Sequence, residues 1–193
     1  MTGYEHMQLD LELLERADAG SVGLRVYRWD SVWVTLGYRQ VPEIALVNPS
    51  AIPWAHRPTG GLAVLHGHDI TVTIALPLSN TLRAYPVATK PLLSALMRQG
   101  IIASTSRGGS EIVSQDCFAS TGRSDLVSEG NKVCGCALRR TKSAVLLQAS
   151  IPVAPPLVSP ESVITGGKEV SYLEIDEDRL RADLQSILQC RAC

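Results

Sequence analysis

The sequence has no excess of either charge, no long apolar run and no basic start. Lys and Arg number 18 against 19 Asp and Glu, which gives a formal net charge of −1. This balance offers no electrostatic attraction to nucleic acid or to an anionic membrane, so we expect neither as a partner. The first twenty residues lack the basic start and apolar core of a secretory signal, and no stretch approaches the roughly 20 apolar residues of a membrane span. We therefore expect a cytoplasmic protein.

The cysteines are odd in number, which argues against a complete disulfide framework and agrees with a reducing compartment. The five thiols are Cys117, Cys134, Cys136, Cys190 and Cys193. Two close pairs suggest zinc, but the Cys-x-Cys pair would share one strand face at poor chelating geometry, and nothing brings the terminal Cys-x-x-Cys nearby. His66 and His68 would also share a face, but they lack a third ligand. We expect no metal site.

The apolar periodicity predicts a mixture of helices and short strands. Predicted helices run through Leu9–Leu14 to Gly20, over 89–100 and over 175–190. Predicted strands cover 22–29, 31–38, 61–67, 70–77, 100–105, 124–128, 131–140 and 143–153. A turn at Gly67-His68-Asp69 predicts that 61–67 and 70–77 form a hairpin. Four prolines between Pro42 and Pro58 argue against regular structure there.

This order of elements predicts an α+β fold in which mostly antiparallel sheets are flanked by helices. At 193 residues with 45% hydrophobic content, the chain can bury one full core. We expect residues 1–193 to form a single domain. The Pro/Ser/Gly-rich stretch 152–167 is interpreted as either an edge loop or a mobile segment.

The segment RPTGGLAVLHG, residues 57–67, places Gly60 and Gly61 directly before an apolar strand. Glycine lets the main chain approach a ligand closely and leaves N–H groups free to bind a phosphate or carboxylate. With Arg57 and Thr59 just upstream, the pair fits such a cradle. A tight turn or bulge entering the strand is the alternative, and the segment alone leaves both open.

Cys117 and Lys132 form a second group of candidate residues. Lys132 follows Cys117 by fifteen positions (132 − 117) and lies near Gly130 and Gly135. A lysine amine that turns inward can hold an acyl carbonyl or a phosphate. A thiol near that amine is expected to have a lowered pKa and to act as a nucleophile at neutral pH. A buried core thiol is the alternative for Cys117.

Three segments, in their order and spacing, resemble the lipoate-protein ligases and octanoyltransferases, which share a fold with the biotin-protein ligases. The family's glycine segment, Arg-Arg-Pro/Ser-Thr/Ser-Gly-Gly-Gly-Ala-Val-Tyr/Leu-His, stands here as HRPTGGLAVLHG. Its lysine segment, Gly-x-Lys-x-x-Gly-Ser-Ala, stands as GNKVCGCALRR, with LLQAS after it. LRVYRWDSVWVTLGYRQ is similar to the family's opening hairpin, with Gly37 and Gln40 at its Gly-x-x-Gln end.

The resemblance implies a tunnel for an octanoyl or lipoyl chain. Carried over by motif position, the substrate-binding residues are Arg57, Thr59, Gly60, Gly61, His66 and Gly135. Lys132 would contact the acyl carbonyl or the phosphate of an acyl-adenylate. Cys117, within DCFASTGRSDLVSEGNK, stands where one transferase branch has its nucleophile. Leu62, Val64 and Val133 would pack the methylene chain.

Two reactions use this scaffold. The transferase takes the acyl group from octanoyl-acyl carrier protein, through a Cys117 thioester, to a lysine of a lipoyl carrier domain such as glycine cleavage H protein or an E2 subunit, and it needs no cofactor. The ligase makes an acyl-adenylate from free lipoate with ATP and Mg²⁺, and it needs no cysteine. The presence of Cys117 favours the transferase. The resemblance also implies that residues 1–193 form a single catalytic domain with no room for the accessory C-terminal domain that many ligases carry, which favours the transferase as well.

Departures from the family pattern bear on this choice. Leu62 stands where a third glycine is usual, His56 where an arginine is usual, and Val72 where an aromatic is common. A side chain at Leu62 would crowd the backbone cradle that a nucleotide phosphate needs, which argues against the ligase. The same departures keep open a third alternative, a degenerate member that binds an acylated carrier or lipoate without turnover. Cys136 and Ala149 stand where Ser and Gly are usual, and each replaces one small side chain by another of nearly the same size.

Overall fold

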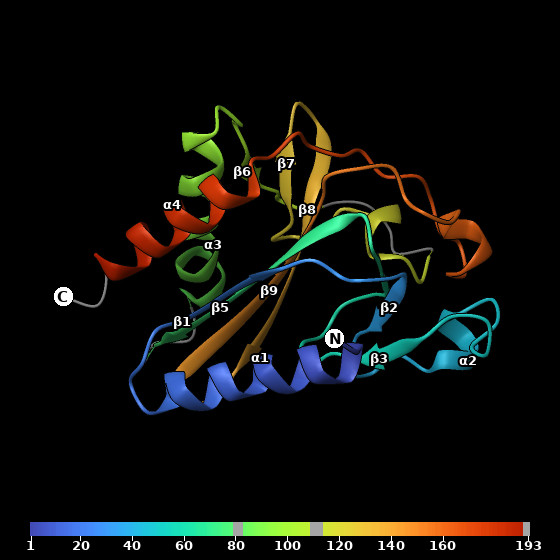
Figure 1. Cartoon of the computed structure of the whole chain (residues 1–193), viewed down its shortest axis with the longest axis horizontal. Helices are drawn as coiled ribbons and strands as arrows, with labels where there is room; N and C mark the ends of the chain where they lie inside the picture. Colours follow the sequence, from blue (N-terminus) through green and yellow to red (C-terminus); the bar gives the residue numbers. More distant parts are fainter. Residues whose placement is uncertain (79–82, 109–113, 191–193) are drawn as a thin grey trace.

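The computed structural model describes residues 1–78, 83–108 and 114–190, and it places them in two sheets with helices on both faces of the larger one (Figure 1). The larger sheet contains, in spatial order, β1 (Gly23–Tyr27), β5 (Asp69–Pro77), β9 (Ala144–Pro152), β8 (Asn131–Arg140), β7 (Leu126–Ser128) and β6 (Ser104–Thr105). All of its neighbouring strands are antiparallel. The α+β prediction is confirmed.

A smaller sheet stands beside the first and is built from β3 (Trp54–His56), β2 (Trp33–Leu36) and β4 (Val64–His66). β2 pairs parallel with β3 and antiparallel with β4. The short helix α2 (Pro42–Ala45) and the 3-10 turn η3 (Pro160–Ser162) lie beside this sheet (Figure 1). Ile164 is fully buried against it, so the stretch 152–167 packs on the fold as an edge segment.

Helix α1 (Gly3–Asp18) covers one face of the larger sheet, while α3 (Ala84–Arg98) and α4 (Glu177–Gln189) cover the other (Figure 1). A capping box between Thr2 and Glu5 begins α1, and the Asp176 carboxylate begins α4 by accepting from the Arg179 N–H at 3.0 Å. A leucine stripe at 180, 184 and 188 buries α4, at roughly 2 kcal/mol for each fully buried side chain.

Side chains alternate along the two central strands, β5 and β9. Ile70, Val72 and Ile74 of β5 pack in the core under α3 and α4, with Leu147 of β9 among their neighbours. The residues between them point to the α1 face, and several are polar although they are buried: Thr71, Thr73, Gln148 and Ser150. Because strand residues alternate between faces, this pattern lines one face of the sheet with hydrogen-bonding groups.

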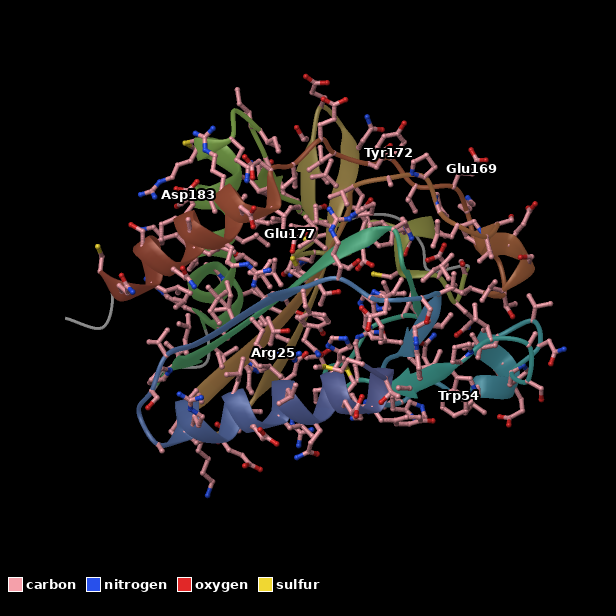
Figure 2. The ribbon with its side chains drawn as sticks, viewed as in Figure 1. Arg25, Trp54, Glu169, Tyr172, Glu177 and Asp183 are labelled. Atoms are coloured by element: carbon pink, nitrogen blue, oxygen red, sulfur yellow. The ribbon has the colours of Figure 1, made fainter. Side chains whose placement is uncertain are left out.

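Buried Asp10 of α1 is hydrogen-bonded to several polar side chains on this face. Its carboxylate accepts from the Thr73 hydroxyl at 2.9 Å, the Gln148 amide at 2.6 Å and the Tyr27 hydroxyl at 3.2 Å. Arg25 of β1 points toward α1 and forms an ion pair with the same carboxylate (Figure 2). Burial raises the pKa of Asp10, and the Arg25 guanidinium and these donors oppose that rise. The network fixes Gln148, which faces the hollow described below.

Two predicted hairpins are wrong: the opening hairpin that the family resemblance implies, and the hairpin at Gly67-His68-Asp69. Strands 22–29 and 31–38 exist as β1 and β2, but β1 pairs with β5 while β2 belongs to the smaller sheet. Likewise β4 and β5 do not form a hairpin, because the chain crosses from one sheet to the other between them. The Asp69 carboxylate holds this corner by accepting from His66 Nδ1 at 2.8 Å and from the Gly67 N–H at 3.3 Å.

Other boundaries differ more modestly. The proline-rich segment 42–58 contains α2 and β3, since Pro42 occupies the first turn of a helix, where its missing N–H costs nothing. Helix α3 begins at Ala84 rather than Thr89, and the predicted strand 100–105 shortens to Ser104–Thr105. Among the helices that the structure describes, none is long and apolar enough to cross a membrane.

Candidate active site

Cys117 and Lys132 meet in space. Cys117 opens the one-turn 3-10 helix η2 (Cys117–Ala119), where its N–H donates to the Ala63 carbonyl at 2.8 Å. Lys132, near the start of β8, extends its amine under this turn. Nζ lies 3.3 Å from Cys117 Sγ, 2.5 Å from the Cys117 carbonyl oxygen and 3.1 Å from the Ser120 carbonyl oxygen. The lysine therefore holds both the thiol and the main chain of the turn that carries it.

Asp125 completes this group, and the sequence analysis gave it no role. Its carboxylate lies 2.7 Å from Lys132 Nζ, and the two side chains are only 7% and 6% exposed. The Asp125 oxygens also accept from the main-chain N–H of Gly122 at 2.6 Å and of Cys136 at 3.0 Å. The Asp-Leu-Val stretch was visible in the sequence, but only the fold shows that its carboxylate is buried on the lysine.

The electrostatics of the thiol differ from the sequence prediction. Burial raises the pKa of Cys117, and Asp125 adds to that rise, while the cations Lys132 and Arg57 oppose it without cancelling it. The expectation of a lowered pKa is therefore wrong, and the resting thiol is protonated at neutral pH. For Lys132, burial lowers the pKa, but the attraction of Cys117 and Asp125 outweighs burial and raises it overall. The amine therefore stays protonated at neutral pH, where its charged partner is Asp125.

Gly135 leaves room for the thiol. It lies in β8 opposite Ser150 of β9, and a β-carbon built there would stand 3.1 Å from Cys117 Sγ and 3.6 Å from the Phe118 ring. That spacing is tighter than ordinary van der Waals contact, so any larger residue would push on the thiol. The absence of a side chain at Gly135 thus leaves the space that the Cys117 thiol occupies.

The glycine segment is shaped first by another stretch of main chain. A β-carbon on Gly37 would stand 2.0 Å from the Gly61 carbonyl oxygen, and Gly61 itself has φ +89°, a value that side chains other than hydrogen rarely allow. The main chain packed against Gly60 and Gly61 is therefore that of Gly37, the residue after β2. The positive φ of Gly61 fits the turn alternative, whereas the ligand cradle stays a prediction.

Arg57 organises the segment from inside. Its guanidinium is buried and donates to the carbonyl oxygens of Gly60 at 2.6 Å, Leu62 at 2.7 Å and Thr35 at 3.1 Å. Burial lowers its pKa to about 10, so it remains charged at neutral pH. Nε donates to Thr59 Oγ1 at 3.2 Å, and that hydroxyl in turn donates to Gln148 at 2.7 Å.

A hollow between the two sheets connects these groups, with about 450 Å³ of empty space including its opening to solvent. It is lined by Met7, Tyr27, Trp29, Thr35, Arg57, Gly61, Val64, His66, Thr71, Cys117, Gly135, Cys136, Ala137, Gln148, Ala149 and Ser150. We call it the inner pocket. His66 stacks on Trp29 with ring centroids 4.2 Å apart, and its Nε2 lies 2.8 Å from the Thr35 hydroxyl. These contacts fix the wall opposite the larger sheet.

The predicted site residues therefore divide into three groups. Arg57, Gly61, His66, Cys117 and Gly135 line the inner pocket together. Thr59, Gly60 and Lys132 stand behind or beside it and support the residues that line it. Of the three residues expected to pack a methylene chain, Val64 lines this pocket, whereas Val133 faces the core under α3 and α4 and Leu62 lies outside.

The remaining cysteines have separate settings. Cys134 and Cys136 share a side of β8 with their sulfurs 3.7 Å apart, and Cys134 lies in the core. Cys190 is exposed at the end of α4, and Cys193 falls outside the described residues. His66 Nδ1 donates to the Asp69 carboxylate and Nε2 hydrogen-bonds to the Thr35 hydroxyl, so neither nitrogen is open to a metal in this arrangement.

We predict that Gly37→Ala destabilises the glycine segment strongly, whereas Gly60→Ala is tolerated. The new β-carbon at Gly37 meets main-chain atoms that cannot move alone, while at Gly60 it meets only the Tyr38 ring at 3.5 Å. Overpacking of this kind costs typically about 1–3 kcal/mol or more. Denaturant unfolding of both variants measures the difference. Equal stability of the two would show that the 37–61 contact is not a constraint.

The family model of the lipoyl protein ligase A/B catalytic domain matches residues 2–185. The chain is 32% identical over 167 residues to octanoyltransferase LipM of Brevibacillus brevis, covering 76% of this chain and 60% of that protein. The chain thus spans about 60% of the length of the curated relatives it matches.

Solved structures agree on the fold. Lipoate-protein ligase A bound with ATP superposes with a TM-score of 0.73 at 21% identity, over 92% of this chain and 76% of the other. The bipartite lipoate protein ligase of Thermoplasma acidophilum, solved with its E2 lipoyl domain, superposes with a TM-score of 0.69 at 20% identity, over 96% and 78%. At these identities the likeness establishes the fold alone.

Proposed function

Because the chain belongs to the lipoyl protein ligase A/B catalytic domain family, we propose that it transfers an octanoyl group from a thioester donor to a lysine of a lipoyl carrier domain. The observation that carries the proposal is the Cys117 thiol, which borders the inner pocket with a buried ammonium 3.3 Å away. The name octanoyltransferase borne by several relatives supports the same reaction class.

The proposed reaction has two balanced steps. In the first, Cys117 Sγ attacks the donor's thioester carbonyl, the bond from that carbon to the donor sulfur breaks, and the departing thiol takes the proton that Cys117 gives up. In the second, the uncharged amine of a carrier lysine attacks the Cys117 thioester, an amide forms, and the thiol of Cys117 is regenerated with the proton from the amine. Each step exchanges one acyl bond for another, so no external energy source is needed.

The surroundings supply what these steps require. Methylene groups of the acyl chain would lie in the inner pocket against Val64, Trp29 and Met7, removed from water. Since the resting thiol is protonated, Lys132 would act by stabilising the thiolate as it forms, and its charge is retained because Asp125 holds it. We assign Cys117 as the nucleophile and Lys132 as the cation that supports it.

ATP-dependent lipoate ligation is the second candidate, because lipoate-protein ligases share this fold. Leu62 argues against it. The residue borders a second hollow beside Gly61, so its side chain would crowd a backbone cradle for a nucleotide phosphate there. The proposed transferase uses neither ATP nor Mg²⁺, since its donor arrives already activated as a thioester.

The test compares donors on the purified protein with a lipoyl domain as acceptor. Octanoyl-acyl carrier protein alone is expected to give an octanoylated domain and, without the domain, an acylated enzyme detected by intact mass. Lipoate with ATP and Mg²⁺ is expected to give no lipoyl domain product and no pyrophosphate. Pyrophosphate release with lipoate would replace the transferase by the ligase, and no product from either donor would leave a binding protein without turnover.

A further inference from the structure

A second hollow opens on the other side of Cys117. It is larger and more open than the inner pocket, with about 1350 Å³ of empty space including open solvent. We call it the outer basin. Gly61, Cys117 and Cys136 line both hollows, so the thiol stands at the boundary between them. An acyl chain in the inner pocket would therefore leave the rest of its donor in the outer basin.

The outer basin carries a surplus of positive charge. Arg107 and Arg123 line it together with Lys132, and Asp125 is the carboxylate among its described lining residues. Asp125 is already paired with Lys132 at 2.7 Å. Both arginines are exposed, and within the described part of the chain no carboxylate forms an ion pair with either one. Among the described residues, these two cations therefore have no carboxylate partner.

The two arginines come from loops that pack against each other. A β-carbon on Gly108 would stand 3.3 Å from the β-carbon of Arg123, so the main chain next to Arg107 lies directly against the 122–124 loop. That loop is fixed in turn, because the Gly122 N–H donates to buried Asp125 at 2.6 Å. The loop that carries Arg123 is thus tied to the ion pair of Asp125 and Lys132.

We infer that the outer basin binds the phosphate of the donor's phosphopantetheine arm through Arg107 and Arg123. The inference rests on the proposed function, which requires a thioester sulfur at Cys117. An arm that leaves this sulfur must cross the outer basin, because the inner pocket holds the acyl chain. A phosphate is the one charged group on such an arm, and guanidinium groups bind phosphate with charge-assisted, often bidentate hydrogen bonds.

The inference is tested with two small donors that differ only in the phosphate, octanoyl-phosphopantetheine and octanoyl-pantetheine. Charge reversal by Arg123→Glu and by Arg107→Glu is expected to raise KM for the first donor at least tenfold and to change KM for the second less than twofold. Arg16→Glu, an exposed position of α1 outside both hollows, makes the same change in net charge and is the control. Equal changes for the two donors would overturn the inference.

A binding measurement separates this inference from the proposed function. Calorimetric titration with phosphopantetheine and with pantetheine, neither carrying an acyl group, is expected to show at least fivefold tighter binding of the phosphate compound, lost in Arg123→Glu. If that difference appears while no donor is turned over, the outer basin is correctly assigned and the transferase is wrong. If the two compounds bind equally, the arginines do not recognise the phosphate, whatever the enzyme does.

Discussion

Replacement of Cys117 by serine is expected to abolish the acyl-enzyme and to slow octanoyl transfer by at least about a thousandfold. The serine hydroxyl is a far weaker nucleophile than a thiol near neutral pH, and Lys132, 3.3 Å from the sulfur, cannot make up that difference. Intact mass after mixing with octanoyl-acyl carrier protein measures the acyl-enzyme. The parent is expected to gain one octanoyl group that hydroxylamine removes, and Cys117→Ser to gain none.

Cys136→Ser is the matched control for this experiment. Cys136 is half-buried and borders the same two hollows as Cys117, but Lys132 donates to Cys117 rather than to it. The main-chain N–H of Cys136 donates to Asp125, and serine retains that contact. Its rate is expected to stay within about twofold of the parent. A mass gain that survives in Cys117→Ser and disappears in Cys136→Ser would move the nucleophile to position 136.

The positions of the strands in the sequence were easier to predict than the strands with which they pair. β8 begins and ends at the predicted residues, since NKVCGCALRR is bounded by Gly130 and by a polar turn. The pairing of β4 and β5 failed because a local turn signal at Gly67 does not say which sheet the next strand joins. That choice depends on the Asp69 carboxylate, which bonds to His66 of one sheet and to Ser150 of the other. Such a contact spans 81 residues and leaves no local trace.

In the site, likewise, the contact between motif residues was predictable, whereas their burial was not. The family resemblance brought Cys117 and Lys132 together, and their contact is present in the structure. The direction of the thiol pKa was mistaken, because proximity to a cation is visible in a motif while burial is not. Gln148 alternates with apolar neighbours in β9, a pattern typical of a solvent-facing strand position, yet it faces α1 and the inner pocket. A polar residue lining a cavity and one facing water look alike in sequence.

Lys132→Met is expected to destabilise the fold by about 3–5 kcal/mol as well as to slow transfer at least about a hundredfold. Removal of the ammonium leaves the Asp125 carboxylate buried without its ion-pair partner, 7% exposed. The double variant Lys132→Met/Asp125→Asn removes both charges and is expected to regain most of the lost stability, while transfer stays slow. Denaturant unfolding measures the first quantity, and Lys142→Met, at an exposed lysine, is the control.

The pH dependence of Cys117 alkylation distinguishes an electrostatic role of Lys132 from a purely structural one. Burial raises the pKa of Cys117, and the Lys132 charge opposes that rise, so Lys132→Met is expected to move the midpoint of iodoacetamide reaction to still higher pH. Asp125 adds to the rise, so the double variant is expected to move part of the way back. An unchanged midpoint in Lys132→Met would reduce the lysine to a support for the 117–120 turn. A shifted midpoint together with slow transfer in the stable double variant would require its charge for the reaction, because the fold is then intact and only the cation beside the sulfur is missing.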